Sequence, residues 1–165
     1  MKQVNAIRGN RGFSLIEAMI GFFILSVGML GIASLQGLSL KAGKTSVYNS
    51  VAMMKVDELF ESMRANPAVL PTYMNPGTFN DCSNVDCTPT QLAQEDVYWW
   101  QENLKAGLPD SITTTTSVVV LAPTLPSRLS TVTVTVNWLE RSKTTTSGES
   151  KTYSMETDIC TLLPC

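Results

Sequence analysis

The most apolar part of the chain lies near the N-terminus. Residues 13–35 form a 23-residue stretch in which Glu17 is the only charged side chain. From Ala18 to Leu35 no residue carries a charge. A helix of about 20 apolar residues is long enough to cross a bilayer. The stretch therefore predicts a membrane-spanning helix with one acid close to its start.

The helical pattern continues through residues 36–66 but becomes amphipathic. One apolar stripe recurs at helical spacing, while charged side chains occupy the other faces. The stripe consists of Ala52, Val56, Leu59, Phe60 and Met63. Asn66-Pro67 ends the pattern, because a residue before proline is biased away from the helical conformation. We expect the stripe to pack against a head formed by residues 67–165.

The head begins with a predicted loop and a second helix. Residues 67–88 are rich in Pro, Asn, Gly and Asp, which is typical of a loop. Thr88 and Gln91 have the spacing of a capping box, Pro89 suits the first helical position, and Gly107 is a natural stop. The predicted buried face of this helix consists of Leu92, Val97, Trp100 and Leu104.

Three strands are predicted after the second helix. The first is Ser111 to Leu121, the second Ser130 to Leu139 and the third Thr152 to Ile159. The second alternates strictly, which predicts a half-buried antiparallel strand. Its apolar face consists of Val132, Val134, Val136 and Trp138. The predicted fold class is α+β, with a long N-terminal helix packed on a small antiparallel sheet and one additional short helix.

Composition excludes several kinds of function. The chain contains no histidine, which removes the commonest general base and metal ligand. After residues 1–12, which hold Lys2, Arg8 and Arg11 and no acid, 9 basic and 14 acidic residues remain. An acidic body argues against generic nucleic-acid binding, which depends on neutralising phosphates. We expect no cofactor, no metal and no enzymatic activity.

The four cysteines form two closely spaced pairs, Cys82/Cys87 and Cys160/Cys165. Four cysteines allow three disulfide connectivities, and a zinc site without histidine needs all four thiolates. We favour two local disulfides, Cys82–Cys87 and Cys160–Cys165, over a zinc site. Disulfides indicate an oxidising compartment such as a periplasm. The basic N-terminal flank independently predicts that the head lies outside the cytoplasm, by the positive-inside rule.

The segment around Glu17 does not fit an ordinary signal peptide or anchor. No convincing small-residue cleavage site follows the apolar run, and an acid within a membrane helix is costly. The sequence from Arg11 to Glu17, RGFSLIE, resembles the class III signal of type IV pilins and pseudopilins. The resemblance implies that residues 1–12 are a leader, that prepilin peptidase cleaves between Gly12 and Phe13, and that Phe13 is N-methylated. It also implies that Glu17 pairs with the N-terminal amine of a neighbouring subunit during assembly.

Further pieces of the chain resemble minor pilins of the type IV pilus modification protein family. They are Glu61 to Pro67, the Cys82/Cys87 segment with Gln91-Leu92-Ala93, Asp96 with Trp99 or Trp100, Leu108-Pro109, and Val132 to Trp138. The resemblance implies a minor pilin that helps to initiate a pilus used in adhesion, twitching motility or DNA uptake. Its implied partners are prepilin peptidase, other minor pilins, the major pilin and, before assembly, inner-membrane lipid. Its implied location is the inner membrane with a periplasmic head, and then the surface pilus.

Two alternatives remain at the level of sequence. A pseudopilin of a type II secretion system shares the N-terminal segment. A tip adhesin would bind an unidentified surface ligand through the exposed threonine face of the second strand, the aromatic residues Tyr98 to Trp100 or the loop 141–150. The aromatic residues are more often core packing than a ligand platform.

Overall fold

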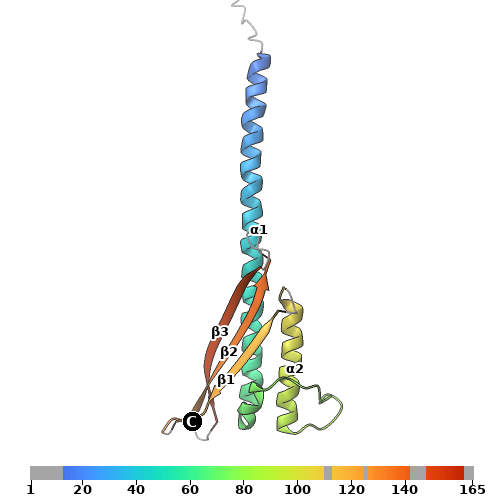
Figure 1. The fold of residues 1–165 in the computed structure, drawn as a ribbon, viewed down its shortest axis with the longest axis vertical. Coiled ribbons are helices and arrows are strands. Elements are labelled where there is room, and N and C mark those ends of the chain that lie inside the picture. Colours follow the sequence, from blue (N-terminus) through green and yellow to red (C-terminus); the bar gives the residue numbers. More distant parts are fainter. Residues whose placement is uncertain (1–12, 110–112, 125, 142–147, 162–165) are drawn as a thin grey trace, which may run out of the picture. The chain divides into compact units, whose positions relative to one another are not determined.

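The computed structural model describes residues 13–109, 113–124, 126–141 and 148–161. A long helix, α1 (Leu15–Ala65), is followed by a 3-10 helix, η1 (Pro67–Met74), and by α2 (Pro89–Gly107). Three strands complete the chain: β1 (Thr115–Leu121), β2 (Leu129–Glu140) and β3 (Glu149–Cys160) (Figure 1). The α+β prediction is confirmed. The chain divides into two compact units, Met1–Gly43 and Lys44–Cys165.

The described part of the first unit is the N-terminal portion of α1. It is long and apolar enough to cross a membrane, with a mean hydropathy of 2.2 over its most apolar window. No residue in that window is buried. The hydroxyls of Ser26 and Ser34 donate to backbone carbonyls one turn back, those of Phe23 (3.2 Å) and Gly31 (2.8 Å). Such internal bonds suit a helix in lipid, because lipid supplies no partner for polar groups.

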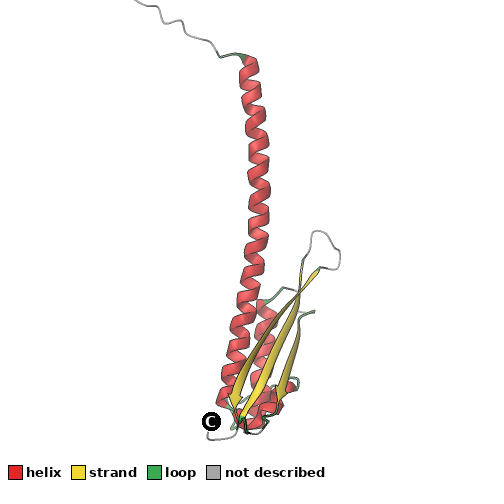
Figure 2. Cartoon of the chain, turned by 90° about the vertical axis from the view of Figure 1, so that its left-hand side faces the viewer, coloured by secondary structure: helices red, strands yellow, loops and turns green. Residues whose placement is uncertain are grey.

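The second unit is a two-layer head. Its antiparallel sheet has the order β1-β2-β3. The remainder of α1 and α2 run side by side on one face of this sheet (Figures 1 and 2). Trp100 on α2 donates through Nε1 to the carbonyl of Lys55 on α1, 2.7 Å away. Gln101 on α2 bonds Thr116 on β1, and Arg64 on α1 bonds Thr157 on β3. Each helix is thus tied to the other helix or to the sheet.

The core of the head contains the residues whose periodic spacing in the sequence predicted burial. The apolar face of β2 is fully buried, as predicted: Val132, Val134, Val136 and Trp138. The stripe on α1 is also buried, as predicted: Ala52, Val56, Leu59, Phe60 and Met63. These two sets belong to one cluster, which includes Val97, Trp100 and Leu104 of α2. The apolar face of β2 and the apolar stripe of α1 are buried against each other and so leave water together. This hydrophobic burial is the main contribution to the stability of such a head.

Four details of the sequence prediction were wrong. Residues 67–74 form η1 rather than a loop, because prolines are tolerated in a short 3-10 turn and Leu70 and Tyr73 anchor it in the core. The first strand begins at Thr115, and the third extends from Glu149 to Cys160. Leu92 is exposed rather than buried, and lines an open pocket between the end of α1 and the start of α2.

Candidate functional site

The residues of the predicted processing site lie at the start of α1. Glu17 is in the first turn of the helix, where a negative charge interacts favourably with the helix dipole. Phe13 and Glu17 are both exposed, and no described residue hydrogen-bonds or ion-pairs with the Glu17 carboxylate. Gly12 and the rest of the predicted leader lie outside the described residues. The cleavage between Gly12 and Phe13 therefore stays a prediction.

The predicted local disulfide in the head is confirmed. Cys82 and Cys87 are bonded, with their Cα atoms 5.4 Å apart. Cys160 is also disulfide-bonded, while its predicted partner Cys165 lies outside the described residues. Metal-binding sulfurs must be thiolates. The zinc alternative is therefore wrong for Cys82 and Cys87, whose sulfurs are bonded to each other.

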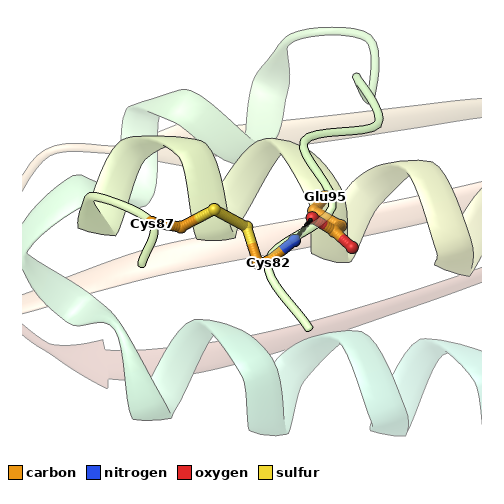
Figure 3. A group of neighbouring side chains, drawn as sticks. All are labelled: Cys82, Cys87 and Glu95. Atoms are coloured by element: carbon orange, nitrogen blue, oxygen red, sulfur yellow. Dashed lines mark hydrogen bonds between the residues drawn. A yellow bond between two sulfur atoms is a disulfide. The ribbon is translucent and has the colours of Figure 1, made fainter. Parts of the chain in front are cut away.

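Glu95 lies beside this disulfide (Figure 3). The donor atoms of Cys82, Cys87 and Glu95 lie within 4.8 Å of one another, close enough in principle for a metal site. However, the Glu95 carboxylate already accepts the backbone N–H of Cys82 (2.7 Å) and the indole N–H of Trp99 (3.2 Å). Both carboxylate oxygens of the buried Glu95 on α2 therefore accept hydrogen bonds, one from the disulfide loop and one from the indole of Trp99. The arrangement is structural.

The loop between η1 and α2 is fastened along α2. The N–H of Thr78 donates to the carbonyl of Gln94 at 3.0 Å, and the Asn80 side chain donates to the carbonyl of Gln91 at 2.9 Å. A Cβ added at Gly77 would lie 2.1 Å from the backbone nitrogen of Tyr98, so this close approach requires glycine. The predicted capping box supports the start of the same helix, since Thr88 and Gln91 bond each other reciprocally.

The predicted aromatic cluster is divided between the core and the surface. Trp100 is buried, which fits the core-packing interpretation. Trp99 is exposed and pairs edge-on with Phe79 and Tyr98, at centroid distances of 5.9 and 5.3 Å. The exposed aromatic surface is therefore built from Phe79 and Trp99 with Tyr98, and Phe79 was not anticipated from the sequence.

A pocket that the sequence prediction missed lies where the end of α1 meets the start of α2. Its volume is about 300 Å³, and it is lined mainly by Ser62, Ala65, Asn66, Pro89, Leu92 and Asp96. The hydroxyl of Tyr73 donates toward Asp96 Oδ2, at 2.9 Å. Burial raises the pKa of Asp96, and burial together with the Asp96 carboxylate raises the pKa of Tyr73. The capping box in the sequence predicts the start of α2, but no sequence signal brings Asp96 to the end of α1.

Comparison with known protein families identifies one matching segment. Residues 7–33 match the prokaryotic N-terminal methylation motif. No curated protein and no solved structure matches the chain. The matched segment contains Arg8, Arg11, Gly12, Phe13, Glu17 and all but the last two residues of the apolar stretch 13–35.

This motif implies processing by prepilin peptidase and assembly with other pilins. The apolar helix that begins within it is suited to membrane anchoring. The N-terminal methylation motif marks type IV pilin-like proteins, and the long N-terminal helix with a small antiparallel sheet agrees with it.

Proposed function

We propose that this chain is a minor pilin that enters a type IV pilus and helps to initiate its assembly. The observation that carries the proposal is the methylation motif at residues 7–33, which includes the start of α1, a helix that continues to Ala65 and is followed by the folded head. An ordinary signal peptide is removed together with its apolar segment. Cleavage between Gly12 and Phe13 instead leaves the whole apolar helix on the mature protein.

The role of Glu17 follows from the same arrangement. Its carboxylate has no partner among the described residues of its own chain. In a filament, the new N-terminal amine at Phe13 of one subunit pairs with Glu17 of another. A buried charge is tolerated when it is paired and is costly when its partner is absent. The pair therefore favours one axial register between subunits.

The minor rather than major role is supported by the downstream pieces that resemble type IV pilus modification proteins, including the segment around Cys82 and Cys87. The chain itself performs no chemistry in this proposal. Its residues act as a peptidase substrate, as an assembly contact and as the core of a head displayed on the pilus. Before assembly, the helix crosses the inner membrane once with the head in the periplasm.

Deletion of the gene tests the proposal. We expect fewer surface pili, with protein secretion unchanged. Wild-type protein should restore pili, whereas Gly12→Val should not, because a branched side chain replaces the small residue before the cleaved bond. Sheared pili from the complemented strain should contain this chain as a small fraction of the major subunit. Normal pili with lost secretion would identify a type II secretion pseudopilin instead.

A further inference from the structure

The pocket at the end of α1 is electronegative. Asp96 supplies a carboxylate, and only its Oδ2 is engaged, by the Tyr73 hydroxyl. Ser62, Ala65 and Asn66 belong to the last turn of α1 or follow it directly. The carbonyls of the last helical turn carry the negative end of the helix dipole. Of these, the Ser62 carbonyl already accepts the N–H of Asn66 at 3.2 Å and the Tyr73 hydroxyl at 3.1 Å. Two independent sources of negative potential therefore meet in one pocket.

No positive charge within the described residues balances this potential. The pocket lining includes no lysine or arginine. Arg64, the basic residue in the last turn of α1, is directed elsewhere. It pairs with Glu61 and donates to the hydroxyl of Thr157 on β3, 2.9 Å away. The Asp96 carboxylate is thus partly withdrawn from water without a cationic partner, an arrangement that costs stability unless a partner arrives from outside.

The remaining walls suit an aliphatic chain. Ala65, Pro89 and Leu92 line the pocket, and Leu92 is 43% exposed although it belongs to the helix that supplies much of the core. Lysine and arginine carry their charge on an apolar stem that packs along such surfaces. A bare divalent cation fits less well, because calcium requires six or more oxygen ligands and the pocket offers one carboxylate.

A second exposed apolar residue extends this surface. Trp99 lies seven residues after Leu92, and positions i, i+4 and i+7 share one face of a helix. Leu92, Asp96 and Trp99 therefore form a stripe along α2, and Trp99 is 48% exposed. An interface anchored by aromatic and aliphatic side chains around a central charge pair is a common arrangement in protein recognition.

We propose that this pocket receives a lysine or arginine side chain of a neighbouring pilin subunit. The inference rests on the proposed function, since it takes the neighbour to be another pilin. The ammonium or guanidinium group pairs with Asp96 beside the end of α1, and the aliphatic stem lies against Leu92. This contact lies in the head and is separate from the predicted pair between Glu17 and Phe13. It gives the head its own means of selecting a neighbour.

Site-specific photocross-linking in piliated cells tests this proposal. The photoreactive residue p-benzoylphenylalanine replaces Leu92 in the full chain, and cross-linked peptides are mapped by mass spectrometry. We expect a cross-link to a pilin, mapping next to a lysine or arginine. Leu121, exposed on β1 in the sheet, is the matched control position and should give no such product. Ala65 is a second probe position at the pocket if the Leu92 variant does not assemble.

Substitution of Asp96 separates charge pairing from simple proximity. Asp96→Asn keeps an acceptor for the Tyr73 hydroxyl, so the melting temperature of the purified full chain should not fall. The cross-link yield should fall at least fivefold, whereas Glu156→Gln, an exposed acid on β3, should leave it unchanged. Asp96→Lys combined with glutamate at the mapped basic residue should restore the yield.

Three results would overturn the inference. One is the absence of a cross-link from Leu92 or Ala65 in cells whose pili contain the processed chain, which leaves the proposed function intact. Another is a cross-link whose yield is unaffected by Asp96→Asn. The third is a product that joins Leu92 to its own chain or to lipid. If the chain were absent from pili altogether, both this inference and the proposed function would fail.

Discussion

Two parts of the same helix, α1, use apolar side chains in opposite ways. In the N-terminal part Phe22 is 71% exposed, and no residue of the most apolar window is buried. In the C-terminal part Phe60 is 1% exposed and belongs to the core of the head. Both are phenylalanines in one continuous helix. Phe60 packs against other residues of the head in its own chain. Phe22 is exposed in the isolated chain, so any packing partner has to come from lipid or from another subunit.

This contrast indicates which interactions belong to folding and which to assembly. Exposed apolar surface of this extent is rare on a soluble monomer and marks contact with a membrane or a partner. The N-terminal part is therefore complete only in lipid or among other subunits. Substitutions there should alter assembly, and substitutions in the head core should alter the free energy of unfolding.

Loss of Glu17 should have the largest effect on assembly. If Glu17 pairs with the amine of a neighbouring subunit as proposed, Glu17→Val leaves that amine unpaired in an apolar environment, and removing one partner of a buried pair costs about 3–5 kcal/mol. We expect the chain to be absent from sheared pili, as measured by immunoblotting. The chain recovered from the membrane should still begin at Phe13, because the proposed pairing takes place after cleavage. Normal incorporation of this variant would contradict the role of Glu17.

The two phenylalanines offer a direct test of the contrast. Phe60→Ala should lower the free energy of unfolding of the full chain in detergent by about 3–5 kcal/mol, since truncating a buried Phe leaves a cavity. Denaturant unfolding followed by tryptophan fluorescence measures this change. Phe22→Ala is the matched control and should change the same quantity by less than about 0.5 kcal/mol. If the two substitutions lowered the free energy of unfolding equally, Phe22 would contribute to folding as much as Phe60 does, which would contradict the division between assembly and folding.

The cap of α2 should have a smaller effect within the head. Thr88 accepts the N–H of Gln91, and its own N–H donates to the Gln91 side chain at 2.9 Å. Thr88→Ala should reduce the free energy of unfolding by about 1 kcal/mol, as for other N-caps. Thr90→Ala is the matched control, because it makes the same replacement of threonine by alanine at an exposed position in the first turn of α2. A loss at Thr90 as large as that at Thr88 would argue against the cap.

The smallest effect is the pH dependence of Asp96. Burial raises the pKa of Asp96 in the folded chain. The stabilising contribution of the neutral acid is therefore present below the unfolded pKa and lost as pH rises through the folded pKa. Asp96→Asn cannot ionise, so its stability relative to wild type should be greater near pH 7 than near pH 3. The melting temperatures of wild type and Asp96→Asn at both pH values measure this effect. If the melting temperatures of the two proteins differed by the same amount at both pH values, ionisation of Asp96 would not oppose folding.

The sequence predicted those parts of the fold that depend on local patterns. The alternation from Val132 to Trp138 and the stripe from Ala52 to Met63 each identify a buried face, because side-chain direction follows directly from strand and helix geometry. The capping box at Thr88 and Gln91 likewise depends on residues three apart. Each of these features was confirmed.

The parts that were missed depend on contacts between distant segments. Leu92 has the helical spacing of a buried residue, but spacing does not reveal that its side chain faces an open pocket and stays exposed. From the sequence alone, an acid such as Glu95 would be expected to face water. In the structure it is buried beneath the loop that contains Cys82, and its carboxylate accepts the backbone N–H of Cys82. The pairing of Asp96 with Tyr73 joins residues on α2 and η1 in the same way. The pocket is likewise lined by residues far apart in the sequence, from Ser62 to Asp96, so it was found only in three dimensions.

The most direct test of the account is the N-terminal peptide of the chain recovered from sheared pili. Trypsin should release a peptide running from Phe13 to Lys41, since no lysine or arginine lies between them. The account predicts that this peptide begins at Phe13 and carries one methyl group on its terminal nitrogen. A chain that retains residues 1–12, or one that begins after the apolar helix, would contradict it.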